Sequence, residues 1–442
     1  MRIGVFGHVG NQNLGDEALI AAVLQTVRRR YPEAELRGFT GRPHDTERRH
    51  RIPAFPIARM NGRQTLAAPP ELLAVPSTRQ RSAPARAWVG LRGRLRRIPF
   101  LPVLVRAARR VGSSVLAVPR ELVFLASSYR RLRGTHLLLV AGSGQLNDYW
   151  AAGPWGFPFT LFKWSLLARA TGTKVAFLSL GAGPLRTRLG KFFIKETLRL
   201  AHYRSYRDHD TRQCIMELKV PGENLMVPDL AFSLDLRPSP GLRTPARRPV
   251  VGINPMPYLD DRYWPESDPR VFGGYVQTLA AFADLLVARG YTVRFFATQL
   301  LADPPVIEQV RGLMRQEPTI EGQERVVAGR ITSFEELIGV IDSLDFVVAT
   351  RYHGTLFSLI RHKPVLSIAY QRKSIELMTQ MGQAEYAIDI GCLTLETLCE
   401  RFFALEGHGA GFTKAVRQRL PVVRRALEAQ YDRAFALVEA IS

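Results

Sequence analysis

The chain has 442 residues, of which 46% are hydrophobic and 23% charged, and this composition excludes a mainly disordered or fibrous protein. The 61 Lys and Arg residues outnumber the 39 Asp and Glu residues, and the net charge of +22 favours partners that carry phosphate, anionic lipid or nucleic acid. A chain of this length predicts about two to four domains.

The cysteines and the start of the chain bear on the cellular compartment. Cys214, Cys392 and Cys399 are too few and too scattered for a disulfide scaffold, and their spacing matches no zinc motif. Residues 1–10 have the pattern of a strand and a turn instead of a secretory signal. No uninterrupted run of about 18 apolar residues occurs. We therefore expect a cytoplasmic protein without a membrane-spanning segment.

The first part of the chain alternates apolar strands with amphipathic helices. The patterns predict strands at 2–6, 136–140 and 174–179, and helices at 17–29 and 159–170. The strands are apolar on both faces, which is typical of a parallel sheet covered by helices. We therefore expect an α/β domain of Rossmann type over residues 1–236.

An Arg-rich insertion at about 60–133 interrupts this domain. Its residues 77–133 contain fourteen Arg, no Lys and one acid, Glu121. Helical spacing predicts one apolar stripe beside the arginines, formed by Trp88, Leu91, Leu95 and Ile98. Such a basic amphipathic helix suits an anionic membrane surface, although it also suits a solvated insertion that packs on its own domain. No nucleic-acid-binding motif surrounds it, so we expect no nucleic-acid partner.

A linker and a second α/β domain follow. Residues 237–248, RPSPGLRTPARR, are rich in proline and lack apolar periodicity, which is typical of a linker. The alternation then restarts, with strands predicted at 250–254, 292–297, 346–349 and 365–369, and helices at 276–288 and 334–343. These patterns predict a second domain over 249–410. Residues 411–442 predict a C-terminal amphipathic helix that packs back across the domain interface.

The loop at 7–17, GHVGNQNLGDE, lies between the first strand and the first helix. Its glycines do not have the dinucleotide-binding spacing, and Asp16 and Glu17 stand where a P-loop has its Lys and Ser or Thr. Hydrolysis of a nucleoside triphosphate is therefore disfavoured. The loop can still present Asn11, Asn13 and backbone amides to an anion, with Asp16 as either a catalytic group or a plain helix cap.

The second domain contains the strongest candidate site. Residues 346–357, FVVATRYHGTLF, predict a buried strand that ends in Arg-x-His-Gly and opens a helix. Ligands of open α/β sheets bind at the carboxyl ends of strands. The helix N-terminus at Gly354 offers amides to an anion, Arg351 offers a two-point grip, and His353 can carry a proton near neutral pH. With Lys373 after the next strand, these groups predict a site for an anionic substrate.

Three turns in the first domain follow strands in the same way. AGSGQLND ends in Asp148, and LGAGPLR ends in Arg186. Their small residues would let a ligand approach the backbone. The motif YRD places Arg207 at another strand end, where a salt bridge that fixes the sheet edge is also consistent with the pattern.

Taken together, the motifs resemble the polysaccharide pyruvyl transferase family. The matching segments are GNQNLGDEAL, AGSGQLND, LGAGPL, YRDHDT with VPDLAF, and ATRYHGTLFSLIRHKPVLSIAYQRKSIELMTQMG, which cover nearly the whole chain outside the insertion. The chain departs from the family at Ser143, where glycine is usual, and at Thr211, where serine is usual. The resemblance implies a glycosyltransferase-B-like (GT-B-like) pair of Rossmann-type domains facing across a cleft. It also implies phosphoenolpyruvate as donor and a pair of sugar hydroxyls in a surface or exopolysaccharide precursor as acceptor.

The implied reaction protonates the enolpyruvyl methylene, adds two sugar hydroxyls and expels phosphate, which leaves a pyruvate ketal. It needs an acid, a base and clamps for anions. His353 is the expected acid. Arg351 and Lys373 are the expected clamps for carboxylate and phosphate, with Arg207 or Arg186 as additions from the first domain.

The other roles are distributed over the first domain. Asp16 and Asp148 are the candidate bases for the sugar hydroxyl, and Asn11, Asn13 and Gly354 are expected to contact substrate. No cluster of His and carboxylates has metal-ligand spacing, and phosphoenolpyruvate is a co-substrate, so we expect neither a metal nor a cofactor. The acceptor is expected to be a sugar or a lipid-linked oligosaccharide at the inner face of the membrane.

Two other functions remain open on the sequence. A nucleotide-sugar-dependent glycosyltransferase of the same architecture would use Arg351 and Lys373 to hold a diphosphate. A non-catalytic membrane-surface component of glycan assembly would use the insertion as its working part. The presence of both His353 and Arg351 argues against the second of these.

Overall fold

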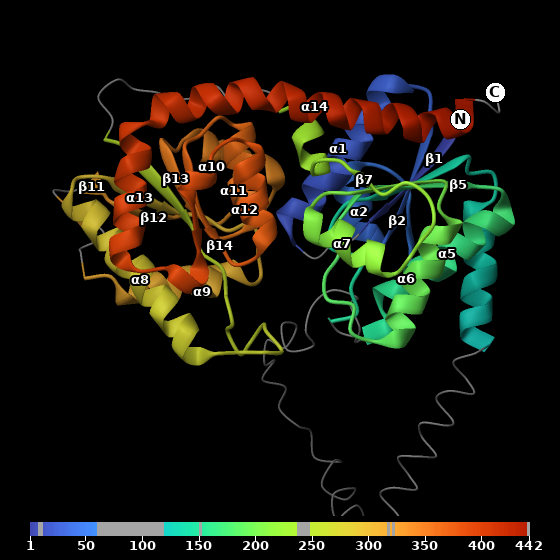
Figure 1. Ribbon diagram of the computed structural model, residues 1–442, viewed down its shortest axis with the longest axis horizontal. Coiled ribbons are helices and arrows are strands. Elements are labelled where there is room, and N and C mark those ends of the chain that lie inside the picture. Colours follow the sequence, from blue (N-terminus) through green and yellow to red (C-terminus); the bar gives the residue numbers. More distant parts are fainter. Residues whose placement is uncertain are drawn as a thin grey trace, which may run out of the picture.

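The computed structural model places most of the chain in two domains (Figure 1). It describes residues 1–7, 12–59, 119–149, 153–236, 248–315, 319–320 and 323–439. The predicted substrate contact Asn11, the apolar stripe around Trp88 and nearly all of the linker lie outside these ranges. Within the part of the insertion that is described, residues 119–132 are helical.

The N-terminal domain is built on a seven-stranded parallel sheet with the order β3-β2-β1-β4-β5-β6-β7. Its strands are β1 (Arg2–Gly7), β2 (Glu35–Thr40), β3 (Ala54–Pro56), β4 (Leu137–Ala141), β5 (Lys174–Leu180), β6 (Tyr203–Tyr206) and β7 (Leu225–Met226). Its helices are α1 (Leu14–Arg30), α2 (Pro43–His50), α5 (Phe157–Thr171), α6 (Arg188–Leu200) and α7 (His209–Glu217), with short 3-10 turns at η2 (Gly153–Trp155) and η3 (Leu230–Ser233).

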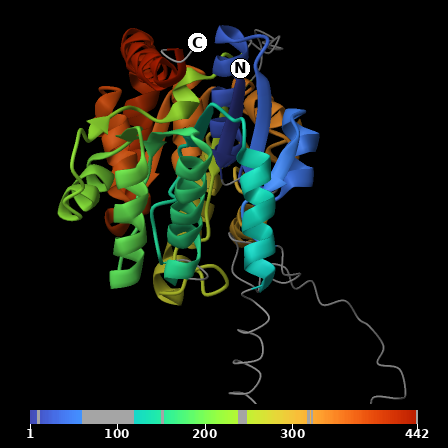
Figure 2. The same cartoon turned by 90° about the vertical axis from the view of Figure 1, so that its right-hand side faces the viewer.

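Helices cover both faces of this sheet (Figure 2). On one face, α1 and η3 join the larger apolar core, which continues into the C-terminal domain. On the other face, helix 119–132, α5 and α6 enclose a second core around Trp164, whose indole N–H donates to the carbonyl of Ile57 at 2.8 Å. Both faces of β4 and β5 are buried, as their apolar sequences predict.

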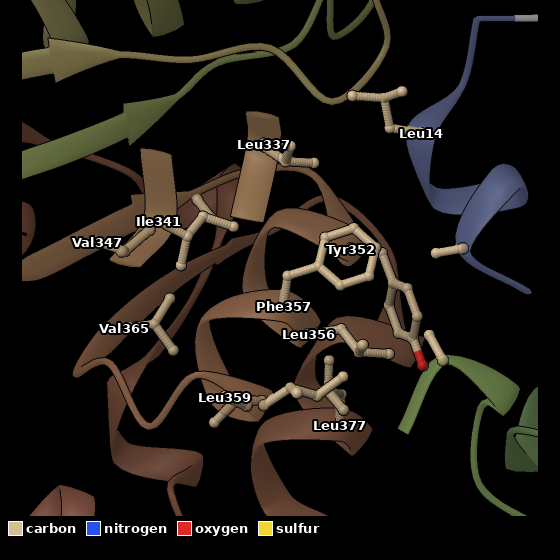
Figure 3. Packing of buried hydrophobic residues seen from close by; sticks show 14 of the residues in the cluster. Leu14, Leu337, Ile341, Val347, Tyr352, Leu356, Phe357, Leu359, Val365 and Leu377 are labelled. Atoms are coloured by element: carbon tan, nitrogen blue, oxygen red, sulfur yellow. The ribbon is translucent and has the colours of Figure 1, made fainter. Parts of the chain in front are cut away.

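The C-terminal domain is built on a six-stranded parallel sheet with the order β12-β9-β8-β13-β14-β15. Its strands are β8 (Val250–Asn254), β9 (Thr292–Phe295), β12 (Val326–Ala328), β13 (Phe346–Ala349), β14 (Val365–Ala369) and β15 (Ala387–Asp389), and β10 (Thr319–Ile320) with β11 (Gln323–Glu324) forms a separate hairpin. Its helices are α8 (Pro269–Ala288), α9 (Asp303–Leu313), α10 (Phe334–Asp342), α11 (Tyr352–Ile360), α12 (Arg372–Gln380) and α13 (Leu395–Gly407), with 3-10 turns at η4 (Ala384–Tyr386) and η5 (Ile390–Cys392). Figure 3 shows part of its core around α11.

The long helix α14 (Gly409–Glu439) crosses both domains (Figure 1). Near its start, Phe412 packs against Tyr386 of the C-terminal domain, with ring centroids 5.7 Å apart. Near its end, Phe435 packs against Tyr31 of the N-terminal domain, with ring centroids 5.1 Å apart. Because one helix is buried on both domains, it restricts how far they can separate.

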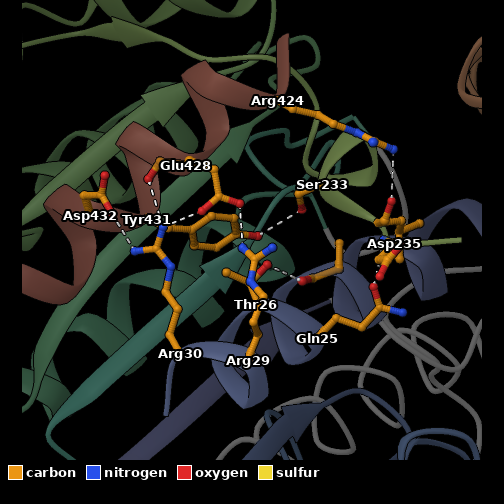
Figure 4. Close-up of polar contacts among 12 residues, drawn as sticks. Gln25, Thr26, Arg29, Arg30, Ser233, Asp235, Arg424, Glu428, Tyr431 and Asp432 are labelled. Atoms are coloured by element: carbon orange, nitrogen blue, oxygen red, sulfur yellow. Dashed lines mark hydrogen bonds and ion pairs between the residues drawn. The ribbon is translucent and has the colours of Figure 1, made fainter. Parts of the chain in front are cut away.

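Ion pairs reinforce the contact of α14 with the N-terminal domain (Figure 4). Arg30, at the end of α1, binds Glu428 at 2.5 Å and Asp432 at 2.6 Å. Arg29 binds the other oxygen of Glu428 at 2.5 Å. These side chains are partly exposed, so their arrangement as a network matters more than any single pair.

The observed elements agree closely with the strand predictions and extend the helix predictions at 17–29, 159–170 and 276–288, whereas the helix predicted at 334–343 ends at Asp342. The predicted strands at 250–254, 346–349 and 365–369 coincide with β8, β13 and β14. The first helix begins at Leu14 instead of residue 17, because the Asn13 side chain accepts a hydrogen bond from the Gly15 N–H and caps the helix. Similarly, α8 begins at Pro269 because Asp268 caps it and proline suits the first helical position.

One helix bears on membrane crossing. Among the described residues, α8 alone is long and apolar enough to cross a membrane by these two criteria. Its buried residues, among them Leu279, Phe282 and Leu286, lie in the larger core. We therefore interpret α8 as a core helix of the C-terminal domain.

Candidate active site

Loops at the carboxyl ends of the two sheets meet at the domain interface. The loop after β1 lies against the loop after β9, where the Leu14 N–H donates to the Thr298 carbonyl and the Leu300 N–H donates to the Gln12 carbonyl, both at 2.9 Å. An antiparallel bridge between Asn13 and Gln299 lies between these two bonds. The start of α1 is therefore fixed against the second domain.

His353 lies in the first turn of α11, at this interface. A Cβ atom added to Gly15 of α1 would lie 2.0 Å from Nδ1 of His353, so the imidazole lies directly against the α1 backbone. The ring is also stacked near Phe357, with centroids 5.7 Å apart and planes at 26°. The imidazole is therefore enclosed by residues from both domains.

The electrostatic surroundings of His353 favour the neutral form in the free protein. Burial lowers the pKa of its imidazole below the usual 6.5, while the charges of Asp229 and Asp16 act in the opposite direction. Its Nε2 is buried and has no hydrogen-bond partner among the described residues. A buried nitrogen of this kind can bind or protonate a substrate atom.

Asp16 and Asn13 stand beside His353 at the start of α1. The Asn13 amide donates to Oδ2 of Asp16 at 3.0 Å. The negative charge of Asp16 acts on His353 and tends to raise the pKa of its imidazole. Asn13 thus caps α1 and positions Asp16.

Arg351 does not have the free guanidinium that its sequence position predicts for a substrate clamp. Its Nε and Nη2 both donate to Oδ1 of Asp303, at 2.9 and 2.5 Å. Asp303 is fully buried at the start of α9, and its Oδ2 accepts from the N–H groups of Thr298 and Gln299. Arg351 therefore fixes the loop that contacts α1, and among the described residues its Nη1 has no hydrogen bond.

We expect Arg351→Lys to lower the free energy of unfolding by about 1–3 kcal/mol, because an ammonium group cannot reproduce the two guanidinium hydrogen bonds to the buried Asp303. The affinity for an anionic donor should fall as well, since the loop that meets α1 loses its anchor. Thermal unfolding and donor titration would measure the two effects. Arg361→Lys is the matched control, because the same two nitrogens of Arg361, Nε and Nη2, bind Asp342 at the far end of α11, one on each carboxylate oxygen. That control should lose stability but keep donor affinity; equal donor affinities in the two variants would contradict the prediction.

Arg207 comes from the N-terminal domain and is 6% exposed. It binds Asp229 at 3.0 Å and Asp208 at 3.4 Å, and its guanidinium lies 5.1 Å from the ring centroid of Tyr352, beside His353. A Cβ atom on Gly181 would lie 2.7 Å from Nη2 of Arg207, so the small residues of LGAGPL make room for this side chain. The salt-bridge interpretation of YRD agrees with these contacts, and the guanidinium still lies close to the histidine.

Lys373 is in the first turn of α12 and makes no ion pair among the described residues. Its Nζ lies 5.6 Å from the ring centroids of both Tyr352 and Tyr370. Lys373 is thus the predicted clamp whose charge is most available to a ligand.

Asp148 acts as an anchor in this structure. Its Oδ1 accepts from the Arg186 N–H at 2.7 Å, and its Oδ2 accepts from the N–H and the hydroxyl of Thr187. Burial would raise its pKa, but these hydrogen bonds outweigh burial and hold the pKa below the ordinary value. A carboxylate that already accepts three hydrogen bonds is poorly suited to remove a proton, so its geometry favours the turn-anchoring role over the base role.

Two further predicted residues make structural contacts, Arg186 across the domain interface and Gly354 within the C-terminal domain. The Arg186 side chain reaches across to Glu266 of the C-terminal domain at 2.9 Å and lies over the ring of Tyr149. Gly354 has Oδ1 of Asn254 beside it, and an added Cβ atom would lie 2.3 Å from that oxygen. The glycine of Arg-x-His-Gly therefore allows close packing of α11 on β8.

The sequence interpretation assigned no role to two residues that the structure brings to the site. Tyr370 was part of the motif AYQRK, and its position directly after β14 was the available signal. Asp303 had no such signal, because its pairing with Arg351 depends on the arrangement of α9. Within the described ranges, no group of three or more His, Cys, Asp or Glu side chains could hold a metal ion.

Solved structures with low sequence identity share the fold of the chain. UDP-GlcNAc 2-epimerase from Neisseria meningitidis, bound to UDP-GlcNAc, has a TM-score of 0.57 at 10% identity, with 99% of this chain and 100% of that chain covered. A UDP-N-acetylglucosamine 2-epimerase from Listeria monocytogenes, described as putative, has a TM-score of 0.54 at 11% identity, with 94% and 90% covered. Sucrose-phosphate synthase from Thermosynechococcus elongatus has a TM-score of 0.52 at 13% identity, with both chains fully covered. These similarities show a GT-B-like fold, as expected from the sequence.

Family membership comes from a sequence comparison. No curated protein matches the chain significantly. The family model described as polysaccharide pyruvyl transferase matches residues 13–372, which is most of the chain. This range includes every candidate residue of the second domain except Lys373, which follows it directly. The chain belongs to the polysaccharide pyruvyl transferase family.

Proposed function

We propose that this protein transfers the enolpyruvyl unit of phosphoenolpyruvate to two hydroxyls of a sugar in a surface or exopolysaccharide precursor, forming a pyruvate ketal. One observation carries the proposal: His353 has a buried Nε2 without a partner among the described residues, and it lies close to cations from both domains. A small, highly charged donor whose methylene must be protonated suits such a group.

The residues around His353 support the first step. Lys373 would neutralise charge on the carboxylate or phosphate of the donor, because it makes no ion pair among the described residues. Arg207 adds positive charge beside Tyr352, although it is paired with Asp229 and Asp208. The negative charge of the bound donor would raise the pKa of the imidazole, so that the acid form is populated when it is needed. Asp16 would stabilise the protonated imidazole, since its charge already acts in that direction.

The proposed function is tested by incubating the purified full chain with phosphoenolpyruvate and candidate glycan acceptors. Release of inorganic phosphate together with an acceptor product of pyruvate-ketal mass would support it. In parallel, phosphoenolpyruvate and nucleotide sugars would be titrated in competition. Transfer from a nucleotide sugar, without transfer from phosphoenolpyruvate, would contradict the proposal and favour a glycosyltransferase. Binding of neither donor would favour a non-catalytic role in glycan assembly.

We further propose a cytoplasmic, peripheral location at the inner membrane face, reached through the Arg-rich segment 77–133. In the described end of this segment, Leu122 and Val123 are exposed to solvent over 60% and 70% of their surface. We expect the protein to sediment with anionic but not neutral vesicles, and to be released by salt because the Debye length falls from about 10 Å at 0.1 M to about 3 Å at 1 M.

Replacing Arg94, Arg96 and Arg97 together with Glu should abolish this sedimentation. A matched control is the same charge change at three exposed arginines of α14, Arg417, Arg419 and Arg425, which should leave it intact. Equal sedimentation with neutral vesicles, or equal loss in both triple variants, would argue against a membrane role for the insertion.

A further inference from the structure

Tyr370 lies at the carboxyl end of the C-terminal sheet, directly after β14. Its ring is packed against the loop that follows β8, with centroids 6.3 Å from Tyr258 and 6.2 Å from Trp264. Nζ of Lys373 on α12 lies 5.6 Å from its ring centroid. The ring therefore lies between the loop after β8 and α12, in the cationic part of the candidate site.

The charges that act on Tyr370 come from both domains and are positive. In decreasing order of effect they belong to Lys373 of α12, Arg351 at the start of α11, and Arg207 of the N-terminal domain. Arg351 is paired with Asp303, and Arg207 is paired with Asp229 and Asp208, whereas Lys373 makes no ion pair among the described residues. The neighbours Tyr258 and Trp264 carry no charge at neutral pH. Lys373 would thus contribute most to stabilising a phenolate at this position.

The effect on ionisation distinguishes Tyr370 from the other tyrosines. Burial alone would raise the pKa of its phenol, but the cations outweigh burial and lower the pKa below the ordinary 10.0. Every other described tyrosine with a resolved shift has a raised pKa: Tyr31, Tyr203, Tyr206, Tyr258, Tyr263, Tyr275, Tyr291, Tyr352, Tyr386 and Tyr431. The downward shift of the pKa is a property of this position and does not follow from burial.

We propose that Tyr370 is a second proton-transfer residue of the site, which takes the proton of the attacking sugar hydroxyl and passes it to the departing phosphate. This inference rests on the proposed function. A second proton-transfer residue is needed because the geometry favours an anchoring role for Asp148, and because Asp16 is placed to support His353. A phenol beside the cations that would bind the phosphate would lie near both the sugar hydroxyl that loses this proton and the phosphate that receives it.

His353 and Tyr370 together account for every proton that moves in the reaction. His353 gives a proton to the methylene carbon, and the first hydroxyl oxygen bonds to the resulting cationic carbon while its proton moves to the Tyr370 phenolate. The bond from that carbon to the phosphate oxygen then breaks, and the Tyr370 phenol returns the proton to the phosphate. The second hydroxyl closes the ring, and its proton restores the His353 imidazolium. No proton is taken from or lost to solvent overall.

The first test follows phenol ionisation by ultraviolet difference spectroscopy. Subtracting the pH titration of Tyr370→Phe from that of the wild type should reveal one phenol that ionises below pH 10. Tyr258→Phe is the matched control, because it removes a neighbouring phenol whose pKa is raised. Inorganic phosphate should shift the Tyr370 ionisation upward in pH, since an added anion destabilises a phenolate. A Tyr370 phenol that ionises at or above pH 10 would overturn the inference.

The second test separates proton transfer from binding. Tyr370→Phe should lower kcat by about 10²–10⁴-fold while the KM for phosphoenolpyruvate changes only a few-fold, and it should remove the rise of kcat/KM with pH. A changed KM with wild-type kcat and pH profile would mean that Tyr370 only positions Lys373, and would overturn the inference. The inference would also be overturned if Asp16→Asn lost the rise of kcat/KM with pH while Tyr370→Phe kept it. A wild-type protein that transfers no pyruvyl group would instead overturn the proposed function itself.

Discussion

Replacing His353 with alanine is expected to lower kcat by about 10²–10⁴-fold and to leave the dissociation constant for phosphoenolpyruvate within a few-fold. The reason is that a proton-transfer group contributes mainly in the transition state, whereas donor charge would be bound mainly by Lys373, with Arg207 beside it. Single-turnover assays and donor titration would measure the two quantities separately.

The matched control for this variant is His362→Ala. His362 follows α11 at its far end, is partly buried, and also has a pKa lowered by burial and a ring nitrogen without a partner among the described residues. It should keep wild-type kcat. If His353→Ala retains near-normal turnover, the imidazole is a packing residue between the domains and the proposed mechanism is wrong.

The pH dependence of the reaction gives an independent check on His353. Because burial lowers the pKa of the free imidazole, the donor must raise it before the acid form is populated. Turnover with saturating donor should therefore fall as the pH rises through the pKa of the donor complex. His353→Ala should lose this descending limb, while His362→Ala should keep it.

Replacing Gly15 with alanine is expected to reduce kcat by about 100-fold or more although residue 15 carries no reactive group. The new Cβ atom would lie 2.0 Å from Nδ1 of His353, which is far shorter than any stable contact. Either the imidazole must turn away or the start of α1 must move off the C-terminal domain. A displacement of about 1 Å at a reacting group costs on the order of 100-fold in rate.

Gly339→Ala is the control for Gly15→Ala, because Gly339 lies within α10 and an added Cβ atom meets nothing within 4 Å. Alanine there should preserve activity and slightly stabilise the helix. Steady-state kinetics and thermal unfolding of both variants would provide the comparison. An active Gly15→Ala protein would show that His353 does not need to lie against α1 during turnover.

The elements of the two sheets were predictable because their signals are local. Continuous apolar runs indicate the bounds of β8, β13 and β14, since parallel strands covered on both faces need apolar residues throughout. The abrupt change from an apolar run to Arg351 and Tyr352 is equally local, and it suffices to place His353 at a strand end. Helix starts were less accurate, because the caps at Asn13 and Asp268 extend α1 and α8 beyond their apolar stripes.

The sequence alone therefore determined the two-sheet architecture, the family and the position of His353 at a strand end. Only the tertiary structure decided which charges are available there. Asp303 takes two of the guanidinium nitrogens of Arg351, and the turn at Thr187 takes the carboxylate of Asp148, although both had the sequence pattern of ligand-binding groups. Conversely, cations on three separate elements lower the pKa of Tyr370 below its ordinary value. Apolar periodicity is encoded within one segment, whereas pairing and ionisation depend on distances between segments that only the folded chain brings together.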